Sequence, residues 1–251
     1  MDNATAGWVS CPRPNLGARL RLFCLPYAGG GALTFRPWQQ LLPREVELCL
    51  IHLPGREQRL AEPALPSLPA LVEALTPKLL PWLDRPFALF GHSMGGLISF
   101  EVVRELRRQQ QTEPSCLFLS AIRAPQLRPR EAPVHQLPTA AFLERLRQLN
   151  GTPEEVLSNP ELVEVMLPAL RADFELFERY QYLPAESLTC PLTVFGGLQD
   201  RDVTREDLMA WREQTSDRFE LRMLPGDHFF INTHRPLLLQ LLATALQRST
   251  R

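Results

Sequence analysis

Short apolar segments alternate with helical patterns along most of the chain. The apolar segments are rich in residues that favour strands and lie at 19–25, 46–53, 87–92, 116–122, 192–197 and 219–224. Their apolar character is continuous rather than alternating, which is typical of strands covered on both faces. Helical patterns lie between several of them, at 68–83, 95–110, 204–215 and 236–248. This order predicts an α/β fold, in which helices flank a mostly parallel sheet.

The alternation stops between residues 137 and 185, where helical patterns follow one another without a convincing strand. Thr152, Pro153 and Glu155 have the spacing of a capping box and predict a helix start. Further on, Pro168 is expected to kink or divide a longer helix. One face of that helix is apolar and consists of Leu162, Val165, Met166, Ala169, Leu170, Phe174 and Phe177.

We interpret residues 137–185 as a helical insertion that forms a lid over the edge of the sheet, and we call it the lid segment. The alternative is a plain pair of core helices. Under the lid interpretation, residues 1–136 and 186–251 are the two parts of one core, and the chain is a single domain. A length of 251 residues fits one large domain with a substantial core.

The composition is that of a soluble globular protein, with 45% hydrophobic and 22% charged residues. A formal net charge of -1 argues against nucleic acid as the main partner. The amino-terminal residues lack the pattern of a secretory signal, and no apolar stretch is long enough to span a membrane. The five cysteines are scattered and include no CxxC pair, which argues against metal binding. We therefore predict a cytoplasmic protein without a bound metal.

Gly91, Ser93 and Gly95 form a G-x-S-x-G motif between a predicted strand and a predicted helix. In that setting the motif is typical of a nucleophile elbow, a sharp turn that exposes the serine hydroxyl. Residues two positions from the serine must be small, because larger ones would collide across the turn. The alternative is a turn that needs its glycines for geometry alone. We favour Ser93 as a nucleophile.

A serine nucleophile needs a base, and in this fold the histidine base follows the serine and the acid in the chain. His228 lies on a glycine-containing loop after the last predicted strand, where the base is expected. His234 is the alternative, and we expect it at the start of the final helix. For His135, which precedes the lid segment, we expect a surface role instead.

The base in turn needs a carboxylate that orients it. Asp200 closely follows the predicted strand 192–197 and is the preferred candidate. Asp202 is the alternative, although we expect it to be solvated or to cap the next helix. Asp227 is a poor candidate because it is adjacent to His228, and adjacent side chains rarely point at each other.

The oxyanion formed by attack on a carbonyl needs two hydrogen-bond donors. The amide of Met94, which follows the nucleophile, is one candidate. The other is expected after an earlier strand, where the three glycines Gly29 to Gly31 permit close backbone approach. There the amide of Ala28 or of Tyr27 is the candidate donor. The glycines do not match the phosphate-binding pattern G-x-x-x-x-G-K-[ST], so we discount nucleotide binding.

Five motifs along the chain resemble those of type II thioesterases, the stand-alone editing enzymes of polyketide and nonribosomal peptide synthases. They are "LFCLPYAGGGALTFRPW", "LPGREQR", "FGHSMGG", "FGGLQD" and "GDHFF", and they occur in order over essentially the whole chain. The resemblance implies an α/β-hydrolase fold and hydrolysis of acyl thioesters held on the phosphopantetheine arm of carrier proteins. It also implies the site residues Ser93, Asp200 and His228, with the Ala28 and Met94 amides as the oxyanion hole and no cofactor.

Two positions depart from the family pattern. Tyr27 stands where members often have histidine or phenylalanine, and Asp227 stands where they often have glycine. Tyr27 is also a candidate substrate contact. In the lid segment, Met166, Phe174 and Phe177 are candidates for lining an acyl channel, and the alternative is that they only pack the lid onto the core.

The expected mechanism is transfer of the acyl group to Ser93 and then to water, with a carrier protein or a small acyl thioester as substrate. Arginines on the helix after the elbow and in the lid segment are candidates for contacting an acidic carrier protein, unless they are ordinary solvated residues. Three alternatives remain: a carboxylesterase or lipase acting on oxygen esters, an acyltransferase or chain-releasing enzyme, and an inactive binding protein with this fold.

Overall fold

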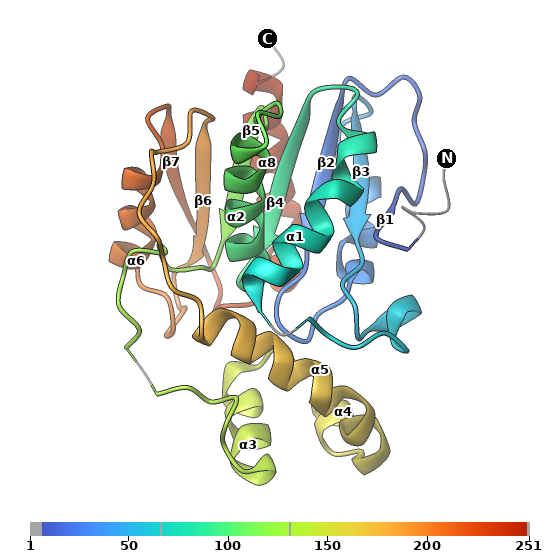
Figure 1. The fold of residues 1–251 in the computed structure, drawn as a ribbon, viewed down its shortest axis with the longest axis vertical. Coiled ribbons are helices and arrows are strands. Elements are labelled where there is room, and N and C mark those ends of the chain that lie inside the picture. Colours follow the sequence, from blue (N-terminus) through green and yellow to red (C-terminus); the bar gives the residue numbers. More distant parts are fainter. Residues whose placement is uncertain (1–6, 66, 131, 250–251) are drawn as a thin grey trace.

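The computed structural model describes residues 7–65, 67–130 and 132–249. Seven strands form one sheet in the order β1-β3-β2-β4-β5-β6-β7 (Figure 1). All neighbouring strands are parallel except the edge strand β1, which is antiparallel to β3. Their bounds are β1 (Val9–Ser10), β2 (Leu20–Leu25), β3 (Val46–Ile51), β4 (Phe87–His92), β5 (Cys116–Ser120), β6 (Leu192–Gly197) and β7 (Phe219–Leu224).

Two hydrophobic cores lie on opposite faces of the sheet, because side chains alternate along each strand. In β2, Phe23 belongs to one core, and Leu22 and Cys24 belong to the other. The first core is covered by α1 (Leu68–Leu79), α2 (Met94–Arg108), α6 (Arg205–Met209) and η4 (Ala210–Gln214). The second core is covered by η1 (Ala32–Gln40), α7 (Phe230–Thr233) and α8 (Arg235–Ser249).

Every strand predicted from the sequence is present. The predicted helices 95–110 and 236–248 are α2 and α8, whereas 68–83 divides into α1 and η3 (Leu80–Trp82), and 204–215 divides into α6 and η4. The strand β1 and the helix η1 were not predicted. β1 has two residues, and η1 is a 3₁₀ helix with a proline inside it, so neither produces a clear periodic pattern.

The lid segment contains three helices and no strand among its described residues: α3 (Thr139–Leu149), α4 (Glu154–Leu157) and α5 (Pro160–Glu178). They lie at the end of the sheet where the parallel strands finish (Figure 1). Their apolar side chains form a third, smaller cluster, which includes Phe142, Leu146 and Leu170. This arrangement suits a cover over one edge of the sheet, and the boundaries of the lid segment remain a prediction.

In the lid segment, the predicted capping box is absent, and the division of the long helix that was one of two expectations at Pro168 does not occur. The N-cap of α4 is Pro153 rather than Thr152, and no side chain caps the helix, so the capping box does not form. α5 runs without division through Pro168, which is exposed. The missing amide of Pro168 costs α5 one hydrogen bond, and its ring crowds the Glu164 carbonyl one turn earlier, but the helix continues on both sides. Asn159 begins α5 by accepting hydrogen bonds from the amides of Glu161 and Leu162.

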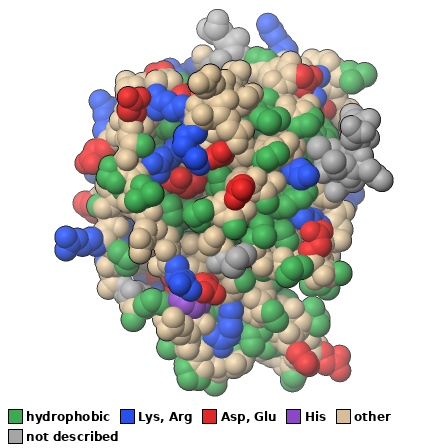
Figure 2. Space-filling model, viewed as in Figure 1, with side chains coloured by type: hydrophobic (Ala, Val, Ile, Leu, Met, Phe, Trp, Pro, Cys, Tyr) green, Lys and Arg blue, Asp and Glu red, His purple; other side chains and the backbone are tan. Residues whose placement is uncertain are grey.

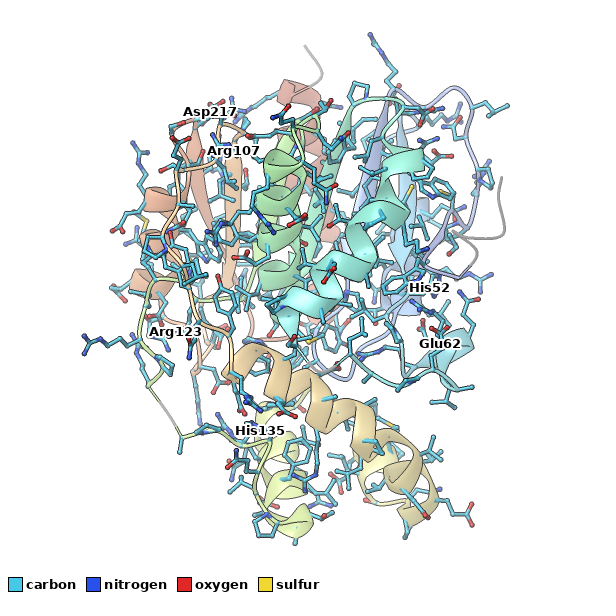
Figure 3. All side chains as sticks on the ribbon, in the orientation of Figure 1. His52, Glu62, Arg107, Arg123, His135 and Asp217 are labelled. Atoms are coloured by element: carbon cyan, nitrogen blue, oxygen red, sulfur yellow. The ribbon has the colours of Figure 1, made fainter. Side chains whose placement is uncertain are left out.

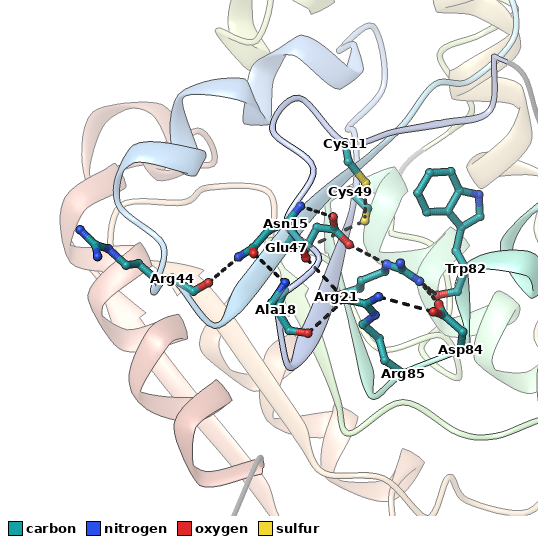
Figure 4. Close-up of polar contacts among 11 residues, drawn as sticks. Cys11, Asn15, Ala18, Arg21, Arg44, Glu47, Cys49, Trp82, Asp84 and Arg85 are labelled. Atoms are coloured by element: carbon teal, nitrogen blue, oxygen red, sulfur yellow. Dashed lines mark hydrogen bonds and ion pairs between the residues drawn. The ribbon is translucent and has the colours of Figure 1, made fainter. Parts of the chain in front are cut away.

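A buried ion pair joins β2 to β3 at neighbouring positions of the ladder (Figure 4). Nε of Arg21 donates to Glu47 across 2.7 Å, and the side chains are only 10% and 6% exposed. The Arg21 guanidinium also bonds the Trp82 carbonyl and Asp84. Burial works to lower the pKa of Arg21, but its hydrogen bonds with Glu47 and Asp84 outweigh burial and raise the pKa. Arg21 is therefore held charged inside the protein.

Replacing Glu47 should destabilise the fold, because it leaves much of the buried Arg21 charge without compensation. We expect Glu47→Gln to lower the free energy of unfolding by about 3 kcal/mol in urea denaturation. Asp84→Asn is the matched control, because Asp84 is 56% exposed and its pair with Arg21 should contribute less than about 1 kcal/mol. Equal losses for the two variants would contradict the prediction.

Candidate active site

Ser93 lies in the sharp turn between β4 and α2. Its backbone has φ 52° and ψ -121°, a conformation that costs a residue with a side chain of order 1–3 kcal/mol. Backbone hydrogen bonds hold it on both sides: the Ser93 amide donates to the Ser120 carbonyl at 2.7 Å, and the Ser93 carbonyl accepts from the amides of Gly96 at 2.8 Å and Leu97 at 3.4 Å. The predicted elbow geometry is therefore present at this serine.

The glycines around Ser93 are required by close backbone contacts. A Cβ atom on Gly91 would lie 2.5 Å from the Gly96 nitrogen, and one on Gly95 would lie 2.6 Å from the Pro26 carbonyl oxygen. Real Cβ atoms do not approach backbone this closely. The contact at Gly95 also brings the chain after β2 against the first turn of α2. The expectation that residues two positions from the serine must be small is thus explained on both sides.

Asp200 and His228 are hydrogen-bonded to each other at the ends of β6 and β7. Nδ1 of His228 lies 2.8 Å from Oδ2 of Asp200, and the side chains are 12% and 1% exposed. Oδ1 of Asp200 accepts from the amides of Asp202 and Val203 at 2.9 and 3.1 Å. With Nδ1 as the donor to Asp200, Nε2 of His228 is left as a proton acceptor. The ring lies beside the elbow, because its centroid is 5.5 Å from that of His92.

The alternative acids have other partners. Asp202 pairs with Arg145 of α3 at 3.0 Å, so it neither caps the next helix nor is simply solvated. The cap of α6 is Thr204, in a capping box with Asp207. Asp227 accepts from the amide of Phe229 at 2.9 Å. The alternative base His234 contacts Thr233 just before α8 begins.

His92 is fully buried beneath the turn. Its Nδ1 lies 2.8 Å from the Ser120 hydroxyl, and its ring packs on Tyr27, Phe229 and Phe230. Burial, and then the nearby charge of His228, lower the pKa of His92 well below its ordinary value of 6.5. His92 is therefore neutral at physiological pH and supports the ring of His228 from below.

We call residues 27–31 the glycine loop. The Tyr27 carbonyl accepts from the Gly30 amide at 2.9 Å, which makes a tight turn. Because carbonyl and N–H point in opposite directions across a trans peptide, the Ala28 amide faces away from that turn. Met94 is the first residue of α2, where the amide has no partner within the helix. Among the described residues, neither amide has a hydrogen-bond acceptor.

The predicted substrate contacts lie in two separate places. Tyr27 is 8% exposed and packs edge-on against Phe229 beside His228. Phe174 packs between Phe142 and Phe177 in the lid cluster. Met166 borders an apolar gap between α3, α4 and α5 that is too small for a water molecule. In this conformation these lid residues pack within the lid segment, and their role in lining an acyl channel stays a prediction.

Several polar residues near the lid segment were missed by sequence reasoning. His135 is 8% exposed and bonds Glu178 of α5 at 2.6 Å, so the predicted surface role was wrong (Figure 3). Glu178 also accepts from the amides of Val134 and His135, which fixes the chain entering the lid segment. Arg56, from the motif "LPGREQR", pairs with Asp173 of α5. The motif could have drawn attention to Arg56, but it did not indicate that Asp173 is the partner of Arg56.

Glu57 anchors the residues that directly follow the glycine loop. Its carboxylate accepts from the amides of Ala32 and Leu33, both at 3.0 Å, and lies 3.4 Å from Nδ1 of His52. His52 in turn lies 2.7 Å from the Ser10 hydroxyl on β1. Glu57 thereby caps the start of η1 and ties it to the chain that follows β3.

Among the residues that the structure describes, two groups of side chains have atoms close enough to hold a metal ion: Cys11 with Glu47 and Cys49, and Asp200 with Asp202 and His228. Their donor atoms already have protein partners. Glu47 is bonded to Arg21, the two thiols lie 3.0 Å apart (Figure 4), and Asp200 accepts three hydrogen bonds. These contacts account for both groups without an ion. Among the described helices, none is long and apolar enough to cross a membrane.

The sequence model of the thioesterase domain family matches residues 20–246. The chain belongs to this family. The gramicidin S biosynthesis protein GrsT of Aneurinibacillus migulanus is 48% identical to this thioesterase, over 89% of this chain and 88% of the relative. Thioesterase PikA5 of Streptomyces venezuelae is 38% identical, over 90% of this chain and 80% of the relative.

Solved structures extend the similarity to the fold. The type II thioesterase BorB from the borrelidin biosynthetic cluster has a TM-score of 0.87 with 35% identity, covering 95% of this chain and 97% of BorB. YbtT, a type II thioesterase from the yersiniabactin pathway, has a TM-score of 0.87 with 29% identity, covering 97% of this chain and 100% of YbtT. The predicted α/β-hydrolase fold and the resemblance to type II thioesterases are confirmed.

Acid should weaken the anchor at Glu57. Burial works to raise the pKa of this carboxyl, but the neighbouring His52 ring and hydrogen bonds from the amides of Leu33 and Ala32 outweigh it, so the pKa lies below the ordinary 4.5. A carboxyl group whose pKa is lowered by folding stabilises the protein at pH values above its ordinary, unfolded pKa. This stability is lost as the pH falls through the pKa of the folded state. We expect the melting temperature of the wild type to fall more than that of Glu57→Gln between neutral pH and about pH 3.

Glu73→Gln is the control for this titration, because Glu73 lies on the exposed face of α1. It should follow the wild-type pH dependence. Parallel curves for the wild type and Glu57→Gln would show that Glu57 does not stabilise the fold through its charge.

Proposed function

We propose that this thioesterase hydrolyses acyl groups from the phosphopantetheine arm of carrier proteins, and so clears stalled or aberrant acyl chains from a polyketide or nonribosomal peptide synthase. The names of its relatives support this role, since they include type II thioesterases of such pathways. The observation that carries the chemistry is the buried Asp200–His228 hydrogen bond beside the strained turn at Ser93.

In this proposal Ser93 is the nucleophile and His228 the base. Nε2 of His228 takes the hydroxyl proton while Oγ of Ser93 attacks the thioester carbonyl carbon, and the carbonyl electron pair moves onto oxygen. When the tetrahedral intermediate collapses, the carbon–sulfur bond breaks. The proton on His228 then passes to the leaving thiolate, which yields a free pantetheine thiol and an acyl ester on Ser93.

In the second half of the reaction, water takes the part that Ser93 has in the first half, and Ser93 is the leaving group. His228 removes a proton from water as its oxygen attacks the acyl-serine, and it then returns the proton to Oγ of Ser93 as the carboxylic acid leaves. Asp200 holds Nδ1 of His228 and stabilises the ring while it is positively charged. The two hydrogen bonds from backbone amides keep Asp200 oriented for this task.

The oxyanion of both tetrahedral intermediates would be bound by the amides of Ala28 and Met94. Met94 adds the electrostatic field of the α2 amino terminus, which favours negative charge. The contact between Gly95 and the chain after β2 supports this assignment, since it brings the two segments together. Tyr27 is proposed to border the acyl group near His228. Met166, Phe174 and Phe177 would contact it only after α3 and α4 move from their present packing.

A carrier protein is the proposed partner, although the arginines singled out in the sequence give this little electrostatic support. Each already has an acidic or carbonyl partner within the protein: Arg104, Arg107, Arg108, Arg145, Arg147, Arg171 and Arg179. Figure 2 shows basic and acidic side chains interspersed on the face it presents, with apolar side chains between them. We therefore place recognition of the substrate chiefly in the pantetheine arm and its acyl group.

Removing the nucleophile should abolish turnover. We expect Ser93→Ala to lower kcat for hydrolysis of an acylated carrier protein by about 10⁴-fold or more, and Asp200→Asn by about 10²- to 10⁴-fold. Mass spectrometry should detect an acyl adduct on Ser93 in the wild type and none in Ser93→Ala. Asp202→Asn is the matched control for the acid and should stay close to wild type.

A comparison with a nitrophenyl ester of the same acyl chain tests the choice of substrate. We expect a higher kcat/KM for the acylated carrier protein. A strong preference for the oxygen ester would favour a carboxylesterase, transfer of the acyl group to an alcohol or amine instead of water would favour an acyltransferase, and the absence of any adduct would favour a binding protein.

A further inference from the structure

One residue of the lid segment reaches the glycine loop. Asp173 of α5 is 3% exposed, and its Oδ2 accepts from the Gly29 amide at 2.8 Å. Leu170, one turn earlier on α5, packs so closely on Gly29 that a Cβ atom there would collide with it. The positive φ of 75° at Gly29 also favours glycine. The helix and the loop are thus joined by a polar and an apolar contact at the same residue.

Arg56 completes this contact from a third segment of the chain. Its two terminal nitrogens donate to the two oxygens of Asp173, each at 2.6 Å, and the Arg56 side chain is only 12% exposed. The same guanidinium donates to the Gly30 carbonyl at 3.2 Å. The buried carboxylate therefore has a full positive counter-charge in bidentate geometry, which is the condition under which such a pair is stable.

These bonds determine how the peptides on both sides of Ala28 are oriented. The peptide before Ala28 is held by the turn from Tyr27 to Gly30. The peptide after it is held by the Gly29 amide on Asp173. Arg56 holds the Gly30 carbonyl, which belongs to the peptide between Gly30 and Gly31. With these peptides fixed, the Ala28 amide has little freedom to rotate away from the oxyanion, and a preorganised donor stabilises charge without reorganisation.

We propose that Asp173 and Arg56 are positioning residues for the oxyanion hole, which act by locking the Ala28 peptide through Gly29 and Gly30. This inference rests on the proposed role of Ala28 as an oxyanion donor. If the proposal holds, α5 both covers the end of the sheet and positions the oxyanion hole, because Asp173, which fixes the glycine loop, belongs to the lid segment.

Three variants separate positioning from stability. Asp173→Asn keeps an acceptor for Gly29 but removes the charge facing Arg56. The double variant Asp173→Leu with Arg56→Met removes both charges together, so no unpaired charge is buried, and replacements of this kind are often tolerated. Glu175→Gln is the matched control, since it neutralises a carboxylate two residues along α5 whose partner Arg179 is exposed.

We measure kcat and KM for an acyl thioester, the affinity for an alkylboronic acid that forms a tetrahedral adduct with Ser93, and the melting temperature. For the double variant we expect kcat and boronic acid affinity to fall by about 10²-fold, the effect of losing one oxyanion donor, while KM changes little. Asp173→Asn should lie between the double variant and wild type. Glu175→Gln should match wild type.

The proposal is overturned if a folded double variant keeps wild-type kcat, or if KM alone changes. If the double variant does not fold, Asp173→Asn decides: wild-type kcat and boronic acid affinity in this variant would equally reject the proposal. Failure of the proposed function is distinct, because then the wild type and Glu175→Gln would also fail to hydrolyse the thioester.

Discussion

The close approach of two backbones at Gly95 is the constraint on which the site depends. The chain leaving β2 lies so near the first turn of α2 that a side chain at position 95 would strike the carbonyls of Leu25 and Pro26. This contact places the chain that leads into the glycine loop beside the start of α2, as the proposed pairing of the Ala28 and Met94 amides requires. The strained turn at Ser93 is stabilised by the same packing. Geometry of this kind needs glycine because only a backbone without Cβ atoms can pack so closely.

The parallel sheet brings the remaining groups to the same edge. Asp200 and His228 follow the adjacent strands β6 and β7, and the carboxyl ends of parallel strands lie side by side. Each group is then held by short local bonds: Asp200 by two backbone amides, and His228 by Asp200 and by the ring of His92. The site is thus assembled from loops that a rigid scaffold positions, rather than from a single rigid element.

Sequence reasoning succeeded where local pattern and chain order carry the information. The strands are continuous apolar segments, the turn at Ser93 is a short motif in its proper setting, and the pairing of Asp200 with His228 follows from their places after consecutive strands. It failed where contacts depend on distant segments. Arg56 and Asp173 are 117 positions apart, and no periodicity connects them. Thr152 shows the opposite failure, because the local capping pattern is complete, yet the helix begins one residue later and no side chain caps it.

The lid segment divides into two parts that are held by different forces. The carboxyl-terminal half of α5 is fixed to the core by the buried pair of Asp173 and Arg56. The helices α3 and α4 reach the loops of Asp200 and His228 through weaker contacts: Arg145 with Asp202, Asn150 with Asp227 at 3.4 Å, and Gly151 against the Phe229 ring. Partly exposed pairs of this kind contribute little free energy. Releasing α3 and α4 from these two loops would therefore cost little, whereas separating them from α5 would expose the apolar cluster that includes Phe142, Leu146 and Leu170. Burial of an acyl chain against that cluster would have to offset this loss, while α5 continues to hold the glycine loop and its proposed oxyanion donor, the Ala28 amide.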